Sequence, residues 1–266
     1  MKKIYIYKNE TKLSNEAYEK FCAVLLDHDF EIMDRYQPDA DLIACIGGDG
    51  TFLHFIHQCD FPSCPIIGIN TGHLGFFQEL MPDDVERFLP LYESGTYSLQ
   101  EIRPIEAEIY TEGGVTRCLG LNEIMVRGPY THITHMEVRV DQTWIQNFSG
   151  DGILISTPVG STAYNYSLGG SIVSPELDVL QMTPIAPSNT NAYRCFYTSV
   201  MYPASRVVTI LPIGRTRDDR LLISYDGLEI LQEKVECVKV RQSDKTIRLI
   251  RFDGYDYWQK LSAKLL

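Results

Sequence analysis

The fold can be read outward from one stretch of the sequence, Leu42-Ile43-Ala44-Cys45-Ile46-Gly47-Gly48-Asp49-Gly50-Thr51. Its continuous apolar start predicts a buried strand, and its glycines allow backbone angles that a Cβ would forbid. Successive N–H groups in such a loop bind anions, and a helix predicted over 51–58 would point its N-terminus at the same ligand. A carboxylate repels phosphate unless a cation or a hydroxyl proton lies between them, so Asp49 indicates catalysis. The alternative is a tight strand-to-helix turn in which Asp49 caps the helix.

The segments on either side of this stretch alternate between strand and helix patterns. Short apolar runs predict strands, and apolar residues at helical spacing predict helices. The predicted elements are a strand at 3–7, a helix at 15–27 with Ser14 as its N-cap, a strand at 31–35, a buried strand at 65–70 and a short helix at 82–89. This alternation indicates a parallel α/β unit.

The pattern changes near residue 97. From 98 to 140 apolar and polar residues alternate, with Gly113-Gly114 as a turn, and this period of two predicts antiparallel strands. We therefore expect the α/β plus all-β class, with an N-terminal parallel α/β domain over 1–98 that carries the glycine loop. A C-terminal antiparallel β-rich domain would follow over 99–252, and the tail at 253–266 would dock back on the first domain. The active site is expected in the cleft between the two domains.

Composition excludes several classes of function. The 266 residues carry 24 Lys and Arg against 35 Asp and Glu, a formal net charge of −11. This charge gives no general attraction to nucleic acid or to anionic lipid. Seven cysteines without a CxxC pair indicate reduced thiols, and no apolar run approaches the length of a membrane span. We expect a soluble, cytoplasmic protein with neither nucleic acid nor membrane as a partner.

Several common site motifs are absent from the sequence. There is no GxxxxGK[ST] P-loop, and the glycine loop does not fit GxGxxG. The segment Val159-Gly160-Ser161-Thr162 does not fit the GxSxG nucleophile elbow of serine hydrolases. Histidines stand three residues apart, at 54 and 57 and at 132 and 135, without a carboxylate or cysteine partner at metal-ligand spacing. We expect surface or packing roles for them and no metal fixed by the protein.

Three further segments extend the glycine loop into a candidate nucleotide site. The next predicted strand ends in Asn70-Thr71-Gly72-His73-Leu74-Gly75-Phe76-Phe77, and successive parallel strands end at one edge of a sheet. The pair Asn122-Glu123 offers an amide and a carboxylate that suit ribose hydroxyls or an adenine edge, or else it forms a solvated turn. A second glycine-flanked aspartate, Asp151, opens a run of hydroxyls and glycines that extends to Gly170. This run is dense enough in hydrogen-bonding groups to wrap a nucleotide.

Taken in order, these segments resemble the signature motifs of the NAD kinase family. The matching motifs are GGDGT at 47–51, NTGHLGF at 70–76, the pair Asn122-Glu123, and DGxxxSTPxGSTAY at 151–164 with Gly169-Gly170. The glycine-aspartate loop is shared with diacylglycerol and sphingosine kinases and 6-phosphofructokinases, whereas GSTAY is more specific to NAD kinases. The resemblance implies transfer of the γ-phosphoryl group of ATP, or in some members of polyphosphate, to the 2′-hydroxyl of the adenosine ribose of NAD, giving NADP.

The resemblance also implies a role for each motif residue. Asp49 would be the general base for the 2′-hydroxyl, and the phosphate donor would lie on a loop formed by Gly47, Gly48, Gly50 and Thr51. The residues implied in NAD binding are Asp49, Gly50, Phe76, Asn122, Glu123, Asp151, Ser161, Thr162, Ala163, Tyr164, Asn165, Ser167 and Ala186. Asp151 and Ala186 would lie at the nicotinamide end. Mg²⁺ or another divalent cation would arrive with ATP, and no tightly bound prosthetic group is implied.

Further features of the family bear on this chain. Asp226, in Ser224-Tyr225-Asp226-Gly227, resembles a family segment near the donor side. Members assemble as dimers or tetramers, and the aromatic stretch at 191–197, with Tyr193, is a candidate for the contact near the nicotinamide site. The position before Gly150-Asp151 is often basic in the family, but Ser149 stands here. This departure puts affinity and donor preference in question, and not the type of reaction.

Two other functions stay open on the sequence. A lipid or small-alcohol kinase of the same superfamily would need an apolar acceptor channel, which the GSTAY segment argues against. A non-catalytic dinucleotide sensor would bind NAD in the same pocket without releasing ADP. Formation of NADP from NAD and ATP would separate both from an NAD kinase.

Overall fold

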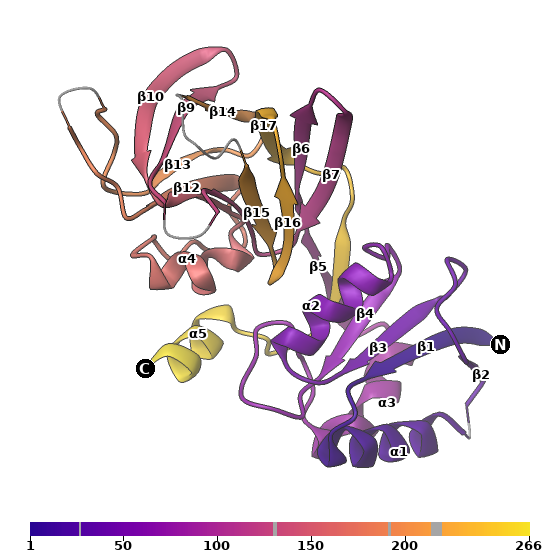
Figure 1. Cartoon of the computed structure of the whole chain (residues 1–266). Helices are drawn as coiled ribbons and strands as arrows, with labels where there is room; N and C mark the ends of the chain where they lie inside the picture. Colours follow the sequence, from indigo (N-terminus) through magenta and orange to yellow (C-terminus); the bar gives the residue numbers. More distant parts are fainter. Residues whose placement is uncertain (27, 130–131, 191–192, 214–219) are drawn as a thin grey trace. The chain divides into compact units, whose positions relative to one another are not determined.

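The computed structural model describes residues 1–26, 28–129, 132–190, 193–213 and 220–266 (Figure 1). The chain forms two compact units, one built from 1–102 together with 245–266 and the other from 103–244. Each unit has its own sheets and its own apolar core. Within the described ranges, no helix is long and apolar enough to cross a bilayer.

The first unit is built on a six-stranded sheet with the order β2-β1-β3-β4-β18-β5. Its strands are β1 (Lys2–Lys8), β2 (Phe30–Met33), β3 (Leu42–Ile46), β4 (Pro65–Ile69), β5 (Tyr97–Ile102) and β18 (Ile247–Phe252). The pairs from β2 to β18 are parallel, and the edge strand β5 is antiparallel to β18. Every residue of β3 is buried, as its continuous apolar run predicts. The parallel α/β class predicted for the N-terminal part is confirmed.

The helices of this unit, with the exception of the last, bury apolar side chains in its interior. They are α1 (Lys12–Leu26), α2 (Asp49–Gln58), the 3₁₀ helix η1 (Pro82–Arg87), α3 (Phe88–Glu93) and α5 (Tyr257–Leu265). The rings of Phe21 in α1 and Phe88 in α3 are fully buried, with centroids 5.3 Å apart, a spacing at which aromatic pairs attract. The C-terminal helix α5, yellow in Figure 1, differs because it has no buried residue.

The start of α1 differs from the prediction. The helix begins at Lys12, so Ser14 is not its N-cap. Thr11 takes that place, since its Oγ1 accepts a hydrogen bond from Ser14 N at 3.3 Å, the bond that an N-cap hydroxyl makes to the third helical amide. Ser14 is buried instead, and its hydroxyl lies 2.6 Å from that of Thr71. A partner in a distant loop therefore determines the role of Ser14.

The second unit contains two six-stranded antiparallel sheets, in the orders β10-β9-β14-β17-β6-β7 and β13-β12-β11-β8-β15-β16. The strands of the first are β6 (Ile105–Thr111), β7 (Gly114–Gly120), β9 (Thr134–Val140), β10 (Thr143–Gly150), β14 (Val208–Pro212) and β17 (Val235–Gln242). Those of the second are β8 (Glu123–Arg127), β11 (Gly152–Ser156), β12 (Val179–Ile185), β13 (Val200–Pro203), β15 (Leu221–Tyr225) and β16 (Leu228–Gln232). The short helices η2 (Val159–Thr162) and α4 (Tyr164–Ser167) follow β11. The predicted antiparallel, β-rich part is confirmed.

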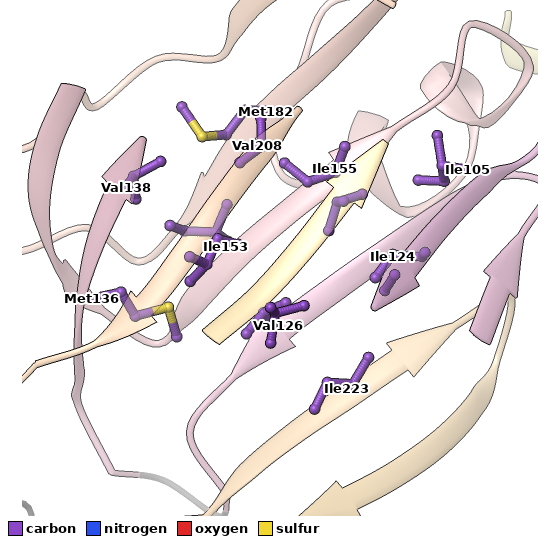
Figure 2. Close-up of a cluster of buried hydrophobic side chains, with 14 of the residues drawn as sticks. Ile105, Ile124, Val126, Met136, Val138, Ile153, Ile155, Met182, Val208 and Ile223 are labelled. Carbon is purple, nitrogen blue, oxygen red and sulfur yellow. The ribbon is translucent and has the colours of Figure 1, made fainter. Parts of the chain in front are cut away.

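Side chains from both sheets form the core of this unit (Figure 2). Met136 and Val138 of β9 are buried at alternate positions, and Ile153 and Ile155 of β11 are buried with them. Burying one such side chain is favourable by about 1.5–3 kcal/mol. A slip of one residue would turn the buried set to the other face, so burial fixes the register of the strands. The register in turn places the loops at the strand ends, where the predicted site residues lie.

Candidate functional site

In the first unit the glycine loop joins β3 to α2, as predicted. A Cβ on Gly47 would lie 2.5 Å from Cβ and Oγ1 of Thr51, so this turn requires glycine. A Cβ on Gly48 or Gly50 would meet no described atom within 4 Å. The helix α2 begins at Asp49, slightly earlier than expected, and its first amides lack partners within the helix. The loop therefore combines a tight turn with an open main chain.

The Asp49 carboxylate is turned toward the loop that follows β4. Its Oδ1 accepts hydrogen bonds from Phe76 N at 3.0 Å and Phe77 N at 3.2 Å. Its Oδ2 lies 3.2 Å from Phe76 N and is paired with Nζ of Lys264 in α5. The Asp49 side chain is 24 % exposed. Gly48 stands at the N-cap of α2, so the alternative in which Asp49 caps the helix is wrong.

The loops that follow β3 and β4 meet, as neighbouring parallel strands predict. A Cβ on Gly75 would lie 1.9 Å from Gln78 Oε1 and 2.5 Å from Asp49 Oδ1, which explains the glycine at this position. The structure thus brings Asp49 and Phe76 together, and they are in contact through the Phe76 amide.

A buried arginine from the C-terminal part of the chain supports the same loop. Arg251 of β18 is 3 % exposed and donates to Phe76 O at 2.8 Å. The Glu79 carboxylate balances its charge at 3.1 Å. Removing both charges of such a buried pair from water costs free energy. The pair therefore serves mainly to fix the backbone geometry of the loop. That backbone presents its amides to Asp49.

Two lysines of α5 also approach this loop, although no sequence motif indicated them. Lys260 donates to Gln78 O. Partial burial, and then the positive charge of Arg251, lowers the pKa of Lys260 to about 8. Lys264 pairs with Asp49. The i, i+4 spacing of the two lysines places them on one face of a helix, but this signal does not say where the helix docks.

In the second unit, Asn122 and Glu123 lie where β7 ends and β8 begins. Asp226, in the turn between β15 and β16, accepts hydrogen bonds from the amides of Leu121 at 2.6 Å, Asn122 at 2.8 Å and Glu123 at 3.3 Å. Asp226 and Gly227 have φ values of +47° and +86°, as the central residues of a type I′ hairpin require. The structure therefore places Asp226 against the Asn122-Glu123 pair, where it supports the backbone.

The Glu123 side chain is largely buried beside this turn. Asn122 is 8 % exposed, so the alternative of a solvated turn is wrong. Burial, and then repulsion by the Asp226 charge, raises the pKa of Glu123 to about 8. Its Oε2 has no hydrogen-bond partner among the described residues, and a buried polar atom in that state costs about 1–3 kcal/mol. A polar ligand at this carboxyl would remove the cost.

The turn after β11 packs directly on the Asn122 backbone. A Cβ on Gly160 would lie 1.9 Å from Asn122 O, so no other residue fits without a shift of the main chain. The Thr157 hydroxyl donates to Leu121 O at 2.7 Å. The structure thus brings together two segments that the sequence analysis assigned to one nucleotide, the Asn122-Glu123 pair and the GSTAY turn.

The predicted site residues of this turn fall into two groups by exposure. Those with accessible side chains are Thr162, Ala163, Tyr164 and Ser167. Ser161 and Asn165 are fully buried. Ser161 Oγ donates to Pro158 O at 2.6 Å, and Asn165 Oδ1 accepts from the Thr183 hydroxyl at 2.6 Å. These two side chains hold the shape of the turn, and a part for them in NAD binding stays a prediction.

Asp151 and Ala186 are neighbours, at the start of β11 and the end of β12. Asp151 N donates to Ile185 O at 3.0 Å, and a Cβ on Gly150 would lie 2.7 Å from Ala186 O. Ala186 has a φ of +45°, a conformation that costs energy in a residue other than glycine and occurs often at functional sites. Because Glu123 pairs with the last residue of β11, the two predicted binding clusters lie at opposite ends of that strand.

Ser149, which stands where the family is often basic, lies next to a stacked pair of rings. It is 2 % exposed and pairs with His135 across β9 and β10. The His135 ring stacks on that of Tyr193, with centroids 4.1 Å apart and 11° between the planes. Residues 191 and 192, the start of the predicted subunit contact, lie outside the described residues.

The described residues contain no group of three or more His, Cys, Asp or Glu side chains that could hold a metal ion. All seven cysteines are free. Burial raises the pKa of Cys59 to about 11 and that of Cys118 to about 12. These thiols serve the packing of the interior rather than nucleophilic chemistry.

Comparison with known families covers most of the chain. Residues 4–97 match the ATP-NAD kinase N-terminal domain, and residues 121–252 match the ATP-NAD kinase C-terminal domain. The NAD kinase of Finegoldia magna (strain ATCC 29328 / DSM 20472 / WAL 2508) is 34 % identical over 266 residues, with 99 % of this chain and 97 % of that protein covered. The NAD kinase of Geobacillus stearothermophilus is 33 % identical over 254 residues, with 94 % and 91 % covered.

Two solved structures share the fold. Yeast NADH kinase, complexed with NADH, superimposes with a TM-score of 0.83 at 20 % identity, over 98 % of this chain and 86 % of that one. An NAD kinase from Archaeoglobus fulgidus, in complex with ATP, gives 0.75 at 22 % identity, over 98 % and 99 %. At these identities the likeness concerns the fold alone.

Proposed function

The chain belongs to the NAD kinase family of enzymes, and we propose that it transfers the γ-phosphoryl group of ATP to the 2′-hydroxyl of the adenosine ribose of NAD, giving NADP. The observation that carries this proposal is the Asp49 carboxylate, which is partly exposed at the glycine loop and held by two backbone amides. Phosphoryl transfer needs little covalent chemistry from the protein, but it needs a group that orients the attacking hydroxyl and a precise position for the donor.

Asp49 acts as the proton acceptor in this reaction. It takes the proton of the 2′-hydroxyl as the ribose oxygen attacks the γ-phosphorus. The bond between that phosphorus and the bridging oxygen of ADP breaks, and ADP leaves with its Mg²⁺. The amides of Phe76 and Phe77 already hold the carboxylate, so little reorganisation is needed when the reaction occurs. General-base catalysis of this kind contributes about 10²–10⁴-fold.

The donor is assigned to the loop of Gly47, Gly48, Gly50 and Thr51. The open main chain at Gly48 and Gly50 supports this assignment, because phosphates approach backbone amides closely in such loops. The N-terminus of α2, a helix of ten residues, favours negative charge at the same place. Mg²⁺ enters as part of the substrate MgATP, and polyphosphate is the alternative donor to be assayed.

NAD is assigned to the residues around Glu123. Its buried carboxyl, with Oε2 unpartnered among the described residues, supports a polar ligand. With a pKa near 8, Glu123 is largely protonated at neutral pH, so it can donate a hydrogen bond to the ribose or the adenine as well as accept one. The other residues proposed to contact or shape the adenosine site are Gly50, Phe76, Asn122, Ser161, Thr162, Ala163, Tyr164, Asn165 and Ser167.

Asp151 and Ala186 are assigned to the nicotinamide end, and a neighbouring copy of the chain is proposed to approach it with Tyr193. The exposed rings of Phe196 and Tyr197, 45 % and 62 % accessible, support a subunit contact near this stretch. We propose a homodimer or homotetramer for this reason. The seven free thiols support the cytoplasm as the compartment.

A coupled assay tests the proposed function. Purified protein is incubated with MgATP and NAD, and NADP is followed with an NADP-specific dehydrogenase. We expect NADP to accumulate with the release of ADP. NAD binding without ADP release would favour the dinucleotide sensor, and ADP release that depends on a lipid or a small alcohol would favour the other kinase. Absence of NADP with both ATP and polyphosphate would remove the proposal.

A further inference from the structure

Three donors hold the carboxylate of Asp49, and they are distributed unequally between its two oxygens. A carboxylate has about four lone-pair positions. The amides of Phe76 and Phe77 lie on Oδ1, and the Phe76 amide is shared with Oδ2. The ammonium of Lys264 lies on Oδ2. Oδ2 therefore carries one full donor, Lys264, and only the longer share of the Phe76 amide, so it is the oxygen with more acceptor capacity left for a hydroxyl.

Lys264 is held in place by the residue that also holds Asp49. Its Nζ lies 4.5 Å from the centroid of the Phe76 ring, within the range of a cation–π contact. Its side chain is 29 % exposed, close to the 24 % of Asp49. Phe76 thus contacts the carboxylate with its amide and the ammonium with its ring, so the three residues form one cluster.

The helix that carries Lys264 contributes little to the core. No residue of α5 is buried, and Trp258 is 59 % exposed. Polar contacts fix the helix, together with the ring of Tyr257, whose centroid lies 6.0 Å from that of Phe76. Asp256 caps its first turn by accepting from Trp258 N at 2.8 Å, and Lys260 donates to Gln78 O. Because Lys260 and Lys264 share one face at i, i+4, this docking places Lys264 at Asp49.

We propose that Lys264 is a positioning residue for phosphoryl transfer, holding Asp49 so that its Oδ2 meets the 2′-hydroxyl of NAD. The inference rests on the proposed function and deepens it. Without Lys264, Oδ2 of Asp49 keeps only the longer contact with the shared Phe76 amide, at 3.2 Å, so this oxygen is held less firmly than Oδ1. A misplacement of about 1 Å at a catalytic group can cost roughly 10²-fold in rate, so the contact matters more for turnover than for stability.

The test compares Lys264→Met, Lys264→Arg and a control, Lys12→Met. Lys12 is 90 % exposed and pairs with Glu16 on α1, so its variant removes one charge from the same unit without affecting the loop. For Lys264→Met we expect kcat to fall about 10- to 100-fold, while the KM values for NAD and ATP stay within about threefold. Lys264→Arg should recover most of the loss, because guanidinium also donates to a carboxylate. Lys12→Met should match the wild type.

A double-mutant cycle with Asp49→Asn separates positioning from a general effect on the fold. If Lys264 acts through Asp49, Lys264→Met should cost almost nothing further once Asp49 is replaced. Full additivity, or wild-type or faster turnover of Lys264→Met alone, would overturn the inference. Thermal unfolding of each variant is measured alongside. A wild-type protein that makes no NADP would overturn the proposed function instead, so the two failures are distinguishable.

Discussion

Asp49 in the first unit and Glu123 in the second are the two carboxyl groups of the proposed reaction, and their surroundings are opposite. Asp49 is partly exposed and accepts from two amides and an ammonium. Glu123 is largely buried, its pKa is raised to about 8, and its Oε2 has no partner among the described residues. The first group is already arranged by the protein, whereas the second has hydrogen-bonding capacity left for a ligand.

This contrast separates a catalytic role from a binding role. A group that moves a proton works best when its geometry is fixed before the substrate arrives. A group that recognises a ligand gains most when the ligand supplies hydrogen bonds that the free protein lacks. Changes at Asp49 should therefore act on kcat, and changes at Glu123 should act on the KM for NAD. Substitutions at the two groups test this division.

The largest effect is expected for Asp49→Asn. The amide has the shape of the carboxylate but cannot accept the hydroxyl proton, so turnover should fall by about 10² or more. NAD binding should largely survive. The measurements are kcat at saturating substrates and the Kd for NAD by calorimetry. Near-normal turnover would show that Asp49 is a turn residue and not the base, and would end the comparison with Glu123.

Glu123→Gln should act mainly on affinity. The amide accepts through only one of its two terminal atoms, whereas a carboxyl can accept through both oxygens, and losing one such bond raises the KM for NAD roughly 10-fold. The KM for ATP and kcat should change little. Glu112→Gln is the matched control, because the Glu112 side chain is 73 % exposed and lies on a hairpin turn. An unchanged KM for NAD in Glu123→Gln would contradict its place in the acceptor site.

Two glycines allow the same contrast to be tested from the backbone. A Cβ on Gly75 would push the Asp49 carboxylate, at 2.5 Å, whereas a Cβ on Gly160 would press on Asn122 O, at 1.9 Å. Gly75→Ala should lower kcat and Gly160→Ala should raise the KM for NAD, each by roughly 5-fold. Gly113→Ala is the control, since its nearest neighbour would lie 3.7 Å away.

The two variants are distinguished by whether kcat or the KM for NAD changes. Gly160→Ala should also lower the Tm, because backbone atoms must shift there, while Gly75→Ala displaces the ends of side chains. If both variants changed the same parameter to the same extent, the two carboxyl groups would not have separate roles.

Local patterns in the sequence predict much of this fold. The apolar run at Leu42–Ile46 is a buried strand within those bounds, because a parallel strand covered on both faces has no polar side to show. The loop that follows lies against the next strand end, as the order of parallel strands requires. Alternation in the second half predicts antiparallel strands, and the core of the second unit shows the same period of two.

Contacts between distant segments are what the patterns miss. The strand Ile247–Phe252 pairs with β4 and β5 in the first unit, and no local feature names those partners. Lys264 is visible as a cation near the chain's end but not as the partner of Asp49. Ser161 and Asn165, which the family resemblance implies in NAD binding, are buried with partners inside the protein. The sequence shows the hydrogen-bonding groups of these two side chains, but the packing of the turn determines that they point into the protein.

The smallest effect is expected in the pH dependence of stability. The pKa of Glu123 rises from the ordinary 4.5 to about 8 in the folded protein. Between these values the folded state keeps a proton that the unfolded chain has lost. The unfolded state therefore binds fewer protons, and the free energy of unfolding falls as pH rises through this window. This contribution of Glu123 to stability is fully present below 4.5 and is lost above 8.

Glu123→Gln removes the titration and should flatten that dependence. The Tm of Glu123→Gln, relative to that of the wild type at the same pH, should rise by a few degrees from pH 5 to pH 8. The reason is that about 1 kcal/mol shifts the Tm by roughly 2–4 °C in a protein of this size. Glu112→Gln should track the wild type, because an exposed carboxyl is solvated in both states. Saturating NAD should reduce the difference if the ligand satisfies the Glu123 carboxyl. If the Tm of Glu123→Gln and that of the wild type changed with pH in parallel, the Glu123 carboxyl would be solvated. Glu123 would then have no unsatisfied hydrogen-bonding capacity for a ligand, and its contrast with Asp49 would be lost.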